Sequence, residues 1–185
     1  MSEPTALERL LLARSVQRGD FVLASGRRSS YYIDCRLTTM SAEGMVLIGG
    51  AGLAAIQATE WDPQAVGGLT MGADPVSYAI AAASFGSTTP VDAFSVRKDA
   101  KQHGTRRRIE GNFRPGERVV VIEDVITSGG SALQAIEAIE EAGGKVAGVL
   151  AVVDREQGGR ARIEAAGYPV VSLTTSTRLG LPSAG

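Results

Sequence analysis

Two adjacent acids stand directly between an apolar run and a loop of small residues. The run 119–122 has the composition of a buried strand, and Glu123 and Asp124 follow it. Residues 125–131 then supply hydroxyls, two glycines and successive backbone N–H groups that lead into a helix, which suits a phosphate. Carboxylates repel phosphate, but they accept hydrogen bonds from ribose hydroxyls or help to hold a metal ion. The segment therefore predicts a ribose-phosphate site.

The alternative for this segment is an ordinary turn between a strand and a serine-capped helix. A Walker A loop is excluded, because the chain contains no Gly-x-x-x-x-Gly-Lys-Ser/Thr sequence. The acid pair favours the ribose-phosphate site over the plain turn.

Positive charge is concentrated in residues 97–108 of a chain whose formal net charge is -1. A diphosphate group gains negative charge as its bond to ribose breaks, and cations in a water-poor site stabilise that charge. Gly104 would let such a segment bend as a lid. The alternative is a solvated basic loop or a nucleic-acid patch.

Apolar runs alternate with helical stretches in the rest of the chain. The expected strands are residues 65–69, 91–96, 118–122, 146–153 and 170–173, and the expected helices between them are 75–85, 131–142 and 160–166. This alternation predicts an α/β fold with a doubly wound, mostly parallel sheet and flanking helices. Ligands bind at the carboxyl ends of strands in such sheets, so we expect the chemistry in the loops after Leu69, Val96, Ile122 and Val153.

The first part of the chain follows a different pattern. Residues 4–17 have helical spacing, with Gly19 as a stop, and residues 21–36 alternate like a strand, a turn and a second strand. We expect this hairpin to lie outside the main core. Residues 41–58 are expected to form a long helix in spite of three glycines.

Composition bounds the class of protein. The 185 residues are 44% hydrophobic and nearly balanced in charge, as in a globular protein rather than a general nucleic-acid binder. Cys35 is the single cysteine, so no disulfide within the chain is expected and the cytoplasm is the expected compartment. No signal-peptide pattern occurs at the start, and no apolar run approaches the roughly 20 residues of a membrane span.

Residues 119–131, VVVIEDVITSGGS, closely resemble the signature with which type I phosphoribosyltransferases bind phosphoribosyl diphosphate (PRPP). The resemblance implies the type I phosphoribosyltransferase fold. It implies that Glu123 and Asp124 meet the ribose hydroxyls and that the following loop cradles the 5′-phosphate. The implied PRPP-binding residues of that loop are Val125, Ile126, Thr127, Ser128, Gly129, Gly130 and Ser131.

The basic segment extends the resemblance to one branch of that family. Residues 95–104, SVRKDAKQHG, are similar to the lid motif of orotate phosphoribosyltransferases. The residues implied to bind diphosphate or PRPP are Arg97, Lys98, Lys101 and His103. The residues implied to take part in the chemical step are Lys101, His103 and Asp124.

Residues 21–36 resemble the F-x-L-x-S-G-x-x-S-x-Y-Y-x-D-x-R signature of the same enzymes. The resemblance assigns orotate binding to Ser25, Gly26, Tyr31 and Tyr32, although Ala24 stands where many members have lysine. Under this interpretation residues 1–185 form a single domain, in which residues 1–40 are an N-terminal hood for base recognition and residues 60–175 the PRPP-binding core. The loop 70–75 resembles the family loop that faces diphosphate, with Ala73 and Asp74 as binding residues.

Selection of orotate over uracil requires a fixed cation for the extra carboxylate, best supplied by arginine. Arg155, in a Val-Asp-Arg segment that resembles the family's, is the candidate, and Thr127 is the second implied orotate contact. A surface salt-bridge cluster among Asp154, Arg155 and Glu156 is the alternative.

The resemblance implies displacement at the anomeric carbon, in which a nitrogen of orotate attacks as diphosphate leaves. Mg²⁺ is the implied cofactor, held mainly by PRPP, and Asp124 is the one protein group that could help. No covalent nucleophile is expected from Cys35. The resemblance further implies a homodimer whose basic loop reaches the neighbouring site, with no nucleic-acid or membrane partner.

Three alternatives remain open in the sequence. The first is a phosphoribosyltransferase for another base, such as a purine. The second is a PRPP-sensing regulator that binds nucleic acid through the basic segment. The third is a dinucleotide-binding oxidoreductase, suggested by the G-x-G-x-x-A match at residues 50–55, although glycines that let helices pack explain that match better.

Overall fold

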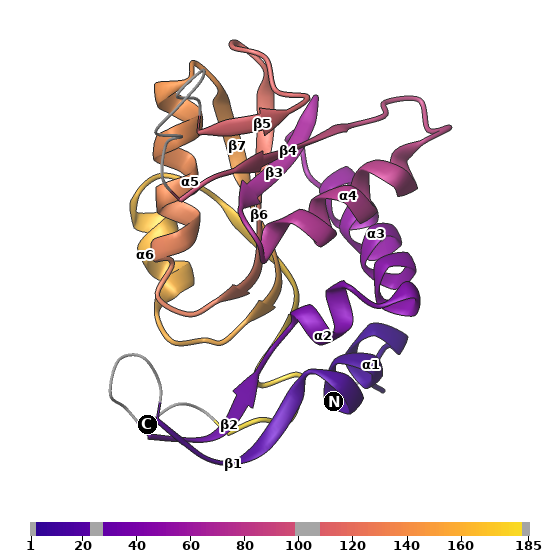
Figure 1. Ribbon diagram of the computed structural model, residues 1–185, viewed down its shortest axis with the longest axis vertical. Helices are drawn as coiled ribbons and strands as arrows, with labels where there is room; N and C mark the ends of the chain where they lie inside the picture. Colours follow the sequence, from indigo (N-terminus) through magenta and orange to yellow (C-terminus); the bar gives the residue numbers. More distant parts are fainter. Residues whose placement is uncertain (1–2, 23–27, 99–107, 183–185) are drawn as a thin grey trace.

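A six-stranded sheet is the centre of the computed structural model, which describes residues 3–22, 28–98 and 108–182 (Figure 1). The strand order is β5-β4-β3-β6-β7-β8, and all neighbours are parallel except β4 and β5. The strands are β3 (Ala65–Leu69), β4 (Asp92–Val96), β5 (Ile109–Gly111), β6 (Arg118–Ile126), β7 (Lys145–Asp154) and β8 (Val170–Thr175). Of these, β5 was not predicted, because three residues at a sheet edge leave no periodic signal.

Helices cover both faces of this sheet, as the sequence predicted. Alternate residues of β6 face opposite ways: Val120 and Ile122 pack in one core cluster and Val119 and Val121 in the other. Figure 1 shows α3 (Ala42–Gln57) and α4 (Ala73–Ser84) on one side of the sheet, and α5 (Gly130–Glu141) and α6 (Gly159–Ala165) on the other. The doubly wound α/β prediction is confirmed.

The chain changes direction between β3 and β6, which are neighbours in the sheet. From β3 it crosses through α4 to β4 on one side, whereas from β6 it crosses through α5 to β7 on the other. The loops at the carboxyl ends of these two strands therefore diverge. Such a switch point is where open α/β sheets bind ligands.

The boundaries of β6 differ from the prediction. The sequence indicated a strand that ends at Ile122, but β6 continues through both acids to Ile126. The extension pairs with β7, where Glu123 lies opposite Ala151 and Ile126 opposite Asp154. The acids thus lie on a paired strand rather than in a free loop, and their backbone is fixed by sheet hydrogen bonds.

The N-terminal part consists of α1 (Ala6–Arg14), a two-stranded sheet of β1 (Val16–Val22) and β2 (Arg28–Ile33), and α2 (Arg36–Thr39). Figure 1 shows it below the carboxyl ends of the main sheet. Two predictions were wrong here. The helix ends before residue 17, because Val16 already pairs with Ile33, and Gly19 lies within β1. The hairpin forms a sheet of its own, as expected, but it is not wholly outside the core, since Tyr31 and Ile33 are buried in the cluster that includes Leu7.

The glycines of α3 serve helix packing. A Cβ atom at Gly49 would lie 2.5 Å from the Ala79 carbonyl oxygen, and one at Gly52 would lie 2.7 Å from Ile80 Cδ1. These contacts bring α3 against α4. Residues 50–55 lie within α3 and do not connect a strand to a helix, so the dinucleotide-binding alternative is wrong. In the described ranges, no helix has the length and apolar character needed to cross a membrane.

A buried carboxylate ties α1 to the segment after β8. Glu8 is 2% exposed and accepts hydrogen bonds from Arg178 Nε at 2.7 Å, Arg178 Nη2 at 2.9 Å and Thr174 Oγ1 at 2.8 Å. The backbone N–H of Thr5 also donates to it, in a capping box that starts α1. These bonds, above all the one from Arg178, lower the pKa of Glu8 to about 2.

Replacement of Glu8 by glutamine should destabilise the protein by roughly 1 kcal/mol at neutral pH, after allowance for solvent screening around Arg178. Because the folded pKa is depressed, the carboxylate stabilises the fold above the ordinary pKa of 4.5, and that stability is lost as pH falls toward about 2. Urea unfolding at about pH 7 and about pH 3 should therefore show a smaller gap between parent and variant in acid.

The matched control is Glu137→Gln, on the exposed side of α5. It should leave stability nearly unchanged at both pH values. An equal cost of Glu8→Gln at both pH values would contradict the assignment of the lowered pKa.

Candidate active site

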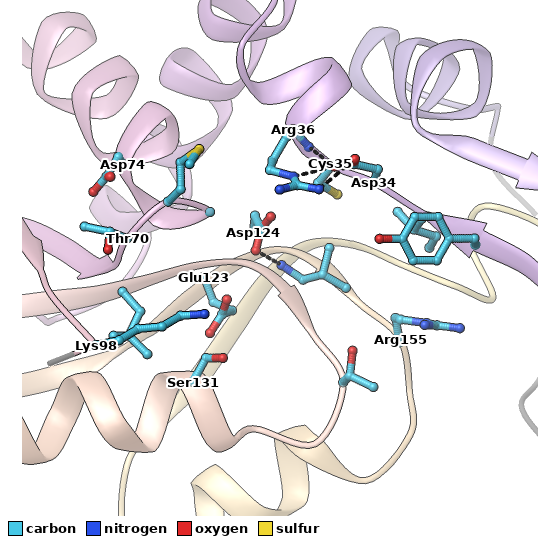
Figure 2. Close-up of a pocket in the computed structure, with 17 residues that line it drawn as sticks. Asp34, Cys35, Arg36, Thr70, Asp74, Lys98, Glu123, Asp124, Ser131 and Arg155 are labelled. Atoms are coloured by element: carbon cyan, nitrogen blue, oxygen red, sulfur yellow. Dashed lines mark hydrogen bonds and ion pairs between the residues drawn. The ribbon is translucent and has the colours of Figure 1, made fainter. Parts of the chain in front are cut away.

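A cavity of ≈ 680 Å³ opens at the switch point between β3 and β6 (Figure 2). Three parts of the chain supply most of its lining. The end of β3, the following loop and the start of α4 supply Leu69, Thr70, Met71, Gly72 and Asp74. The end of β6, the following loop and the start of α5 supply Glu123, Asp124, Val125, Thr127 and Ser131, and the hood supplies Tyr32, Ile33, Asp34, Cys35 and Arg36. Lys98 and Arg155 complete the lining.

The acid pair occupies the middle of this cavity, as Figure 2 shows. Burial, and then the negative charge of Asp124, raises the pKa of Glu123 well above its ordinary value. Asp124 Oδ1 accepts a hydrogen bond from the backbone N–H of Val125 at 2.9 Å. The two carboxyl groups thus differ in character: that of Glu123 favours its neutral form, and that of Asp124 accepts a hydrogen bond from the backbone of the next residue.

The loop after β3 approaches Asp124 closely because it contains glycine. A Cβ atom at Gly72 would lie 2.6 Å from Asp124 Oδ1, so a side chain there would displace the carboxylate. Of the two residues predicted in this loop, Asp74 lines the cavity, and its Oδ1 atom is buried with no hydrogen-bond partner in the described structure. Ala73 does not line the cavity; it is 1% exposed and packs in the core.

The predicted phosphate loop leads into the N-terminus of α5. Gly129 has φ +76° and precedes the helix, a conformation that favours glycine. Gly159 holds the loop from behind, since a Cβ atom there would lie 2.5 Å from the Thr127 carbonyl oxygen and 2.8 Å from the Gly129 nitrogen. Thr127 and Ser131 line the cavity, whereas Ile126 is a core residue and Ser128 is exposed. The helix N-terminus favours an anion at this end.

The predicted basic residues separate into three groups. Lys98 lines the cavity. Arg97 is not part of the lining; its Nε atom lies 3.3 Å from Glu110 on β5, so the structure does not bring it to the site. Lys101 and His103 lie outside the described residues, as do Ser25 and Gly26 of the hood.

Arg155 is a buried cation on the cavity wall. The residue directly follows β7 and is 5% exposed. Its backbone N–H donates to the Ile126 carbonyl at 3.0 Å. Its Nε and Nη2 atoms are buried and have no hydrogen-bond partner within the described ranges. The guanidinium carbon lies 4.9 Å from the centre of the Tyr31 ring. A buried charge with unused donors is costly unless an anion pairs with it, so the cavity is suited to an anionic group at this end.

The salt-bridge alternative for Arg155 does not match this geometry. Asp154 Oδ1 accepts from the backbone N–H of Glu156 at 2.8 Å, and Glu156 Oε2 accepts from the backbone N–H of Thr177 at 2.7 Å. Neither acid forms an ion pair with Arg155 within the described part of the chain. Among the described residues, the Nε and Nη2 donors of Arg155 therefore have no acidic partner.

Known proteins carry the same domain and the same fold. The phosphoribosyl transferase domain family matches residues 45–171. An orotate phosphoribosyltransferase of Aquifex aeolicus is 49% identical over 176 residues, which is 94% of this chain and 95% of the relative. The orotate phosphoribosyltransferase of Mycobacterium tuberculosis H37Rv in complex with PRPP has a TM-score of 0.78 at 41% identity and covers 95% of this chain and 97% of its own. The chain belongs to the orotate phosphoribosyltransferase family.

A more distant structure agrees on the fold alone. The adenine phosphoribosyltransferase of Leishmania tarentolae has a TM-score of 0.64 at 16% identity. The type I phosphoribosyltransferase fold implied by the sequence resemblance is confirmed.

A charged pair in the hood, Asp34 and Arg36, was not predicted as part of the site. Arg36 donates through Nε to Asp34 Oδ1 at 2.8 Å and through Nη2 to Asp34 Oδ2 at 2.9 Å, and both residues line the cavity. Hydrogen bonding from Arg36 lowers the pKa of Asp34. Their place in the Y-Y-x-D-x-R pattern was the available signal. Between them, burial raises the pKa of the Cys35 thiol well above its ordinary value, as expected of a packed residue rather than a nucleophile.

Replacement of Gly72 by alanine should weaken PRPP binding by about tenfold or more, because the added methyl group would occupy the space of the Asp124 carboxylate. Titration calorimetry with PRPP and Mg²⁺ measures this effect. The matched control is Gly50→Ala, where the added carbon would meet no atom within 4 Å beyond its chain neighbours and the backbone of its own helix. Unchanged PRPP affinity in a folded Gly72→Ala variant would show that the position of Asp124 is not required.

Proposed function

We propose that the chain transfers the ribose-phosphate of PRPP to orotate, giving orotidine 5′-monophosphate and diphosphate in the synthesis of UMP. The observation that carries the proposal is Arg155, which lines the cavity and whose buried guanidinium atoms Nε and Nη2 have no hydrogen-bond partner among the residues that the structure describes. Orotate differs from uracil by a carboxylate, which is the group that such a fork binds best. The family to which the chain belongs supports the same substrate.

In this proposal the phosphate loop and the acid pair hold PRPP. Backbone N–H groups of the loop that ends at Ser131 bind the 5′-phosphate at the start of α5. Glu123 and Asp124 meet the ribose hydroxyls; the raised pKa of Glu123 favours its neutral form, which can donate a hydrogen bond to an oxygen while Asp124 accepts one. Thr127, which lines the cavity beside them, can contact the base and the phosphate alike.

The reaction exchanges one bond for another at the anomeric carbon. The bond from this carbon to the diphosphate oxygen breaks, and its electron pair leaves with diphosphate. A ring nitrogen of orotate forms the new bond, and Asp124 is the proposed acceptor of the proton that this nitrogen loses. Lys98 stabilises the charge that develops on the leaving oxygens, and Lys101 and His103 are proposed to do the same. Catalysis then depends on position and charge rather than on a covalent intermediate.

Mg²⁺ is the proposed cofactor, and the residues present fit a metal held mainly by its substrate. No group of three or more acidic, histidine or cysteine residues suited to a metal is found in the described ranges. Among the described residues, Asp124 and the Oδ1 atom of Asp74, which has no hydrogen-bond partner there, are groups that could hold the ion or its water. When bound, it would neutralise diphosphate charge.

We also propose a homodimer in which the basic segment beyond Lys98, including Lys101, reaches the neighbouring site, with no nucleic-acid partner and a location in the cytoplasm. Large apolar side chains exposed on α2, on α3 and between them support burial against a second copy; these are Leu37, Met40, Met45 and Val46. If sites are shared, mixing Lys101→Ala with Asp124→Asn should restore activity in hybrid dimers. Absence of recovery after confirmed subunit exchange would count against sharing.

The direct test follows the loss of orotate absorbance after addition of protein, PRPP and Mg²⁺, with uracil, hypoxanthine and adenine as parallel bases and a metal-free control. We expect turnover of orotate alone, and only with the metal. Consumption of a purine would retain the PRPP site and overturn the base assignment. Binding of PRPP without turnover of any base would favour the regulator alternative.

A further inference from the structure

The segment after β8 has no role in the reaction described above, yet it contacts the wall that carries Arg155. Ser176 is 2% exposed and its backbone N–H donates to the Asp154 carbonyl at 2.9 Å, one residue before Arg155. Its Oγ atom lies 3.3 Å from the hydroxyl of Tyr31 on β2. Leu179 and Leu181 are buried beyond it. The segment therefore joins the hood to the strand end that presents the arginine.

Tyr31 was expected to bind orotate, but the structure places it behind Arg155. The residue is 2% exposed and is absent from the cavity lining, whereas its neighbour Tyr32 is 38% exposed and lines the cavity. Successive residues of a strand face opposite ways, so only one of the pair can meet the base. The other lies against the guanidinium, 4.9 Å from ring centre to Arg155 Cζ.

This contact leaves the hydrogen-bond donors of Arg155 unused. The face of an aromatic ring attracts a cation without accepting its N–H groups in the way a carboxylate would. The ring can therefore hold the guanidinium in one orientation while Nε and Nη2 remain without partners in the described structure. An acidic partner in the same place would fix the arginine but also neutralise it. The arrangement suits an arginine that must be preorganised for a carboxylate on a ligand.

We propose that Tyr31 is a positioning residue for base selection: its ring orients Arg155 for the carboxylate of orotate, and Ser176 holds the ring in place. The inference rests on the proposed function, because it assigns the carboxylate to orotate. Tyr31 acts through Arg155 and does not touch the base. Ser176 thereby gives the C-terminal segment a part in substrate specificity.

Steady-state kinetics of three variants test the proposal, with KM for orotate and for PRPP measured separately. Tyr31→Leu removes the ring and should raise KM for orotate about tenfold, while KM for PRPP changes by less than about twofold. Tyr31→Phe keeps the ring and Ser176→Ala keeps the tyrosine. Each removes one of the two hydroxyl groups that contact each other, so each abolishes the same contact. Each should raise KM for orotate about two- to fivefold, and the double variant should add nothing further.

The matched control is Tyr168→Phe, which removes a hydroxyl bonded to Glu140 at 2.7 Å outside the cavity and should leave both KM values unchanged. Equal increases in KM for orotate and PRPP in Tyr31→Leu would show a merely structural residue and overturn the proposal. Unchanged KM for orotate in Tyr31→Leu would also overturn it. If Tyr31→Leu does not fold, the other variants still test the proposal. Additive increases in KM for orotate in the double variant of Tyr31→Phe and Ser176→Ala, or no increase in either single variant, would contradict it.

Failure of the proposed function is distinguishable from failure of this inference. A parent protein that does not consume orotate overturns both. A parent that consumes orotate, together with a folded Tyr31→Leu variant of normal orotate KM, overturns the positioning role alone.

Discussion

Two neighbouring parallel strands, β3 and β6, send their crossover helices to opposite faces of the sheet, and the geometry of the site depends on the gap that this leaves. The divergence opens a cavity at the carboxyl ends of both strands. Backbones must approach closely around that gap, and glycine permits the approach on both sides. Gly72 leaves room for Asp124, and Gly159 leaves room for the phosphate loop. The hood then closes the cavity from a third direction.

Ionisable groups in the cavity lack the partners that a bound substrate would supply. Burial raises the pKa of Glu123, and Arg155 keeps buried donors without partners in the described residues. Each such group lowers the stability of the unliganded protein, and substrate oxygens or a substrate carboxylate would relieve the cost. Away from the cavity, a buried carboxylate has hydrogen-bond partners. Glu8 accepts hydrogen bonds from Arg178 and Thr174, and it takes no part in the proposed reaction. Buried ionisable groups that lack partners are therefore assigned to ligand binding, whereas buried groups with a full set of hydrogen bonds are assigned to stability.

Much of the sheet could be predicted from sequence because buried strands are continuous apolar runs. The core strand 65–69 was predicted with its observed limits, and the acids after Ile122 were placed at the correct edge. Features set by tertiary pairing were not predictable. The extension of β6 to Ile126 depends on β7, which lies far along the chain. The same holds for the two basic residues after β4. Lys98 lines the cavity, whereas its neighbour Arg97 lies against Glu110 of β5.

Alternation along a strand also explains why the tyrosine pair was only half assigned. The signature indicated both residues of the pair, but which one faces the ligand depends on what covers the hairpin. Arg155 could be singled out by the need for a cation, yet its burial, and its lack of an acidic partner among the described residues, are visible only in the fold. That lack of a partner is the strongest physical argument for an anionic base.

The most direct test of this account is the catalytic efficiency of an Arg155→Gln variant, with Arg114→Gln on an exposed surface as the control. The account predicts that kcat/KM for orotate falls about a hundredfold or more, because charged hydrogen bonds to a carboxylate are lost, while PRPP affinity is retained. A folded Arg155→Gln variant that uses orotate as well as the parent does would contradict it.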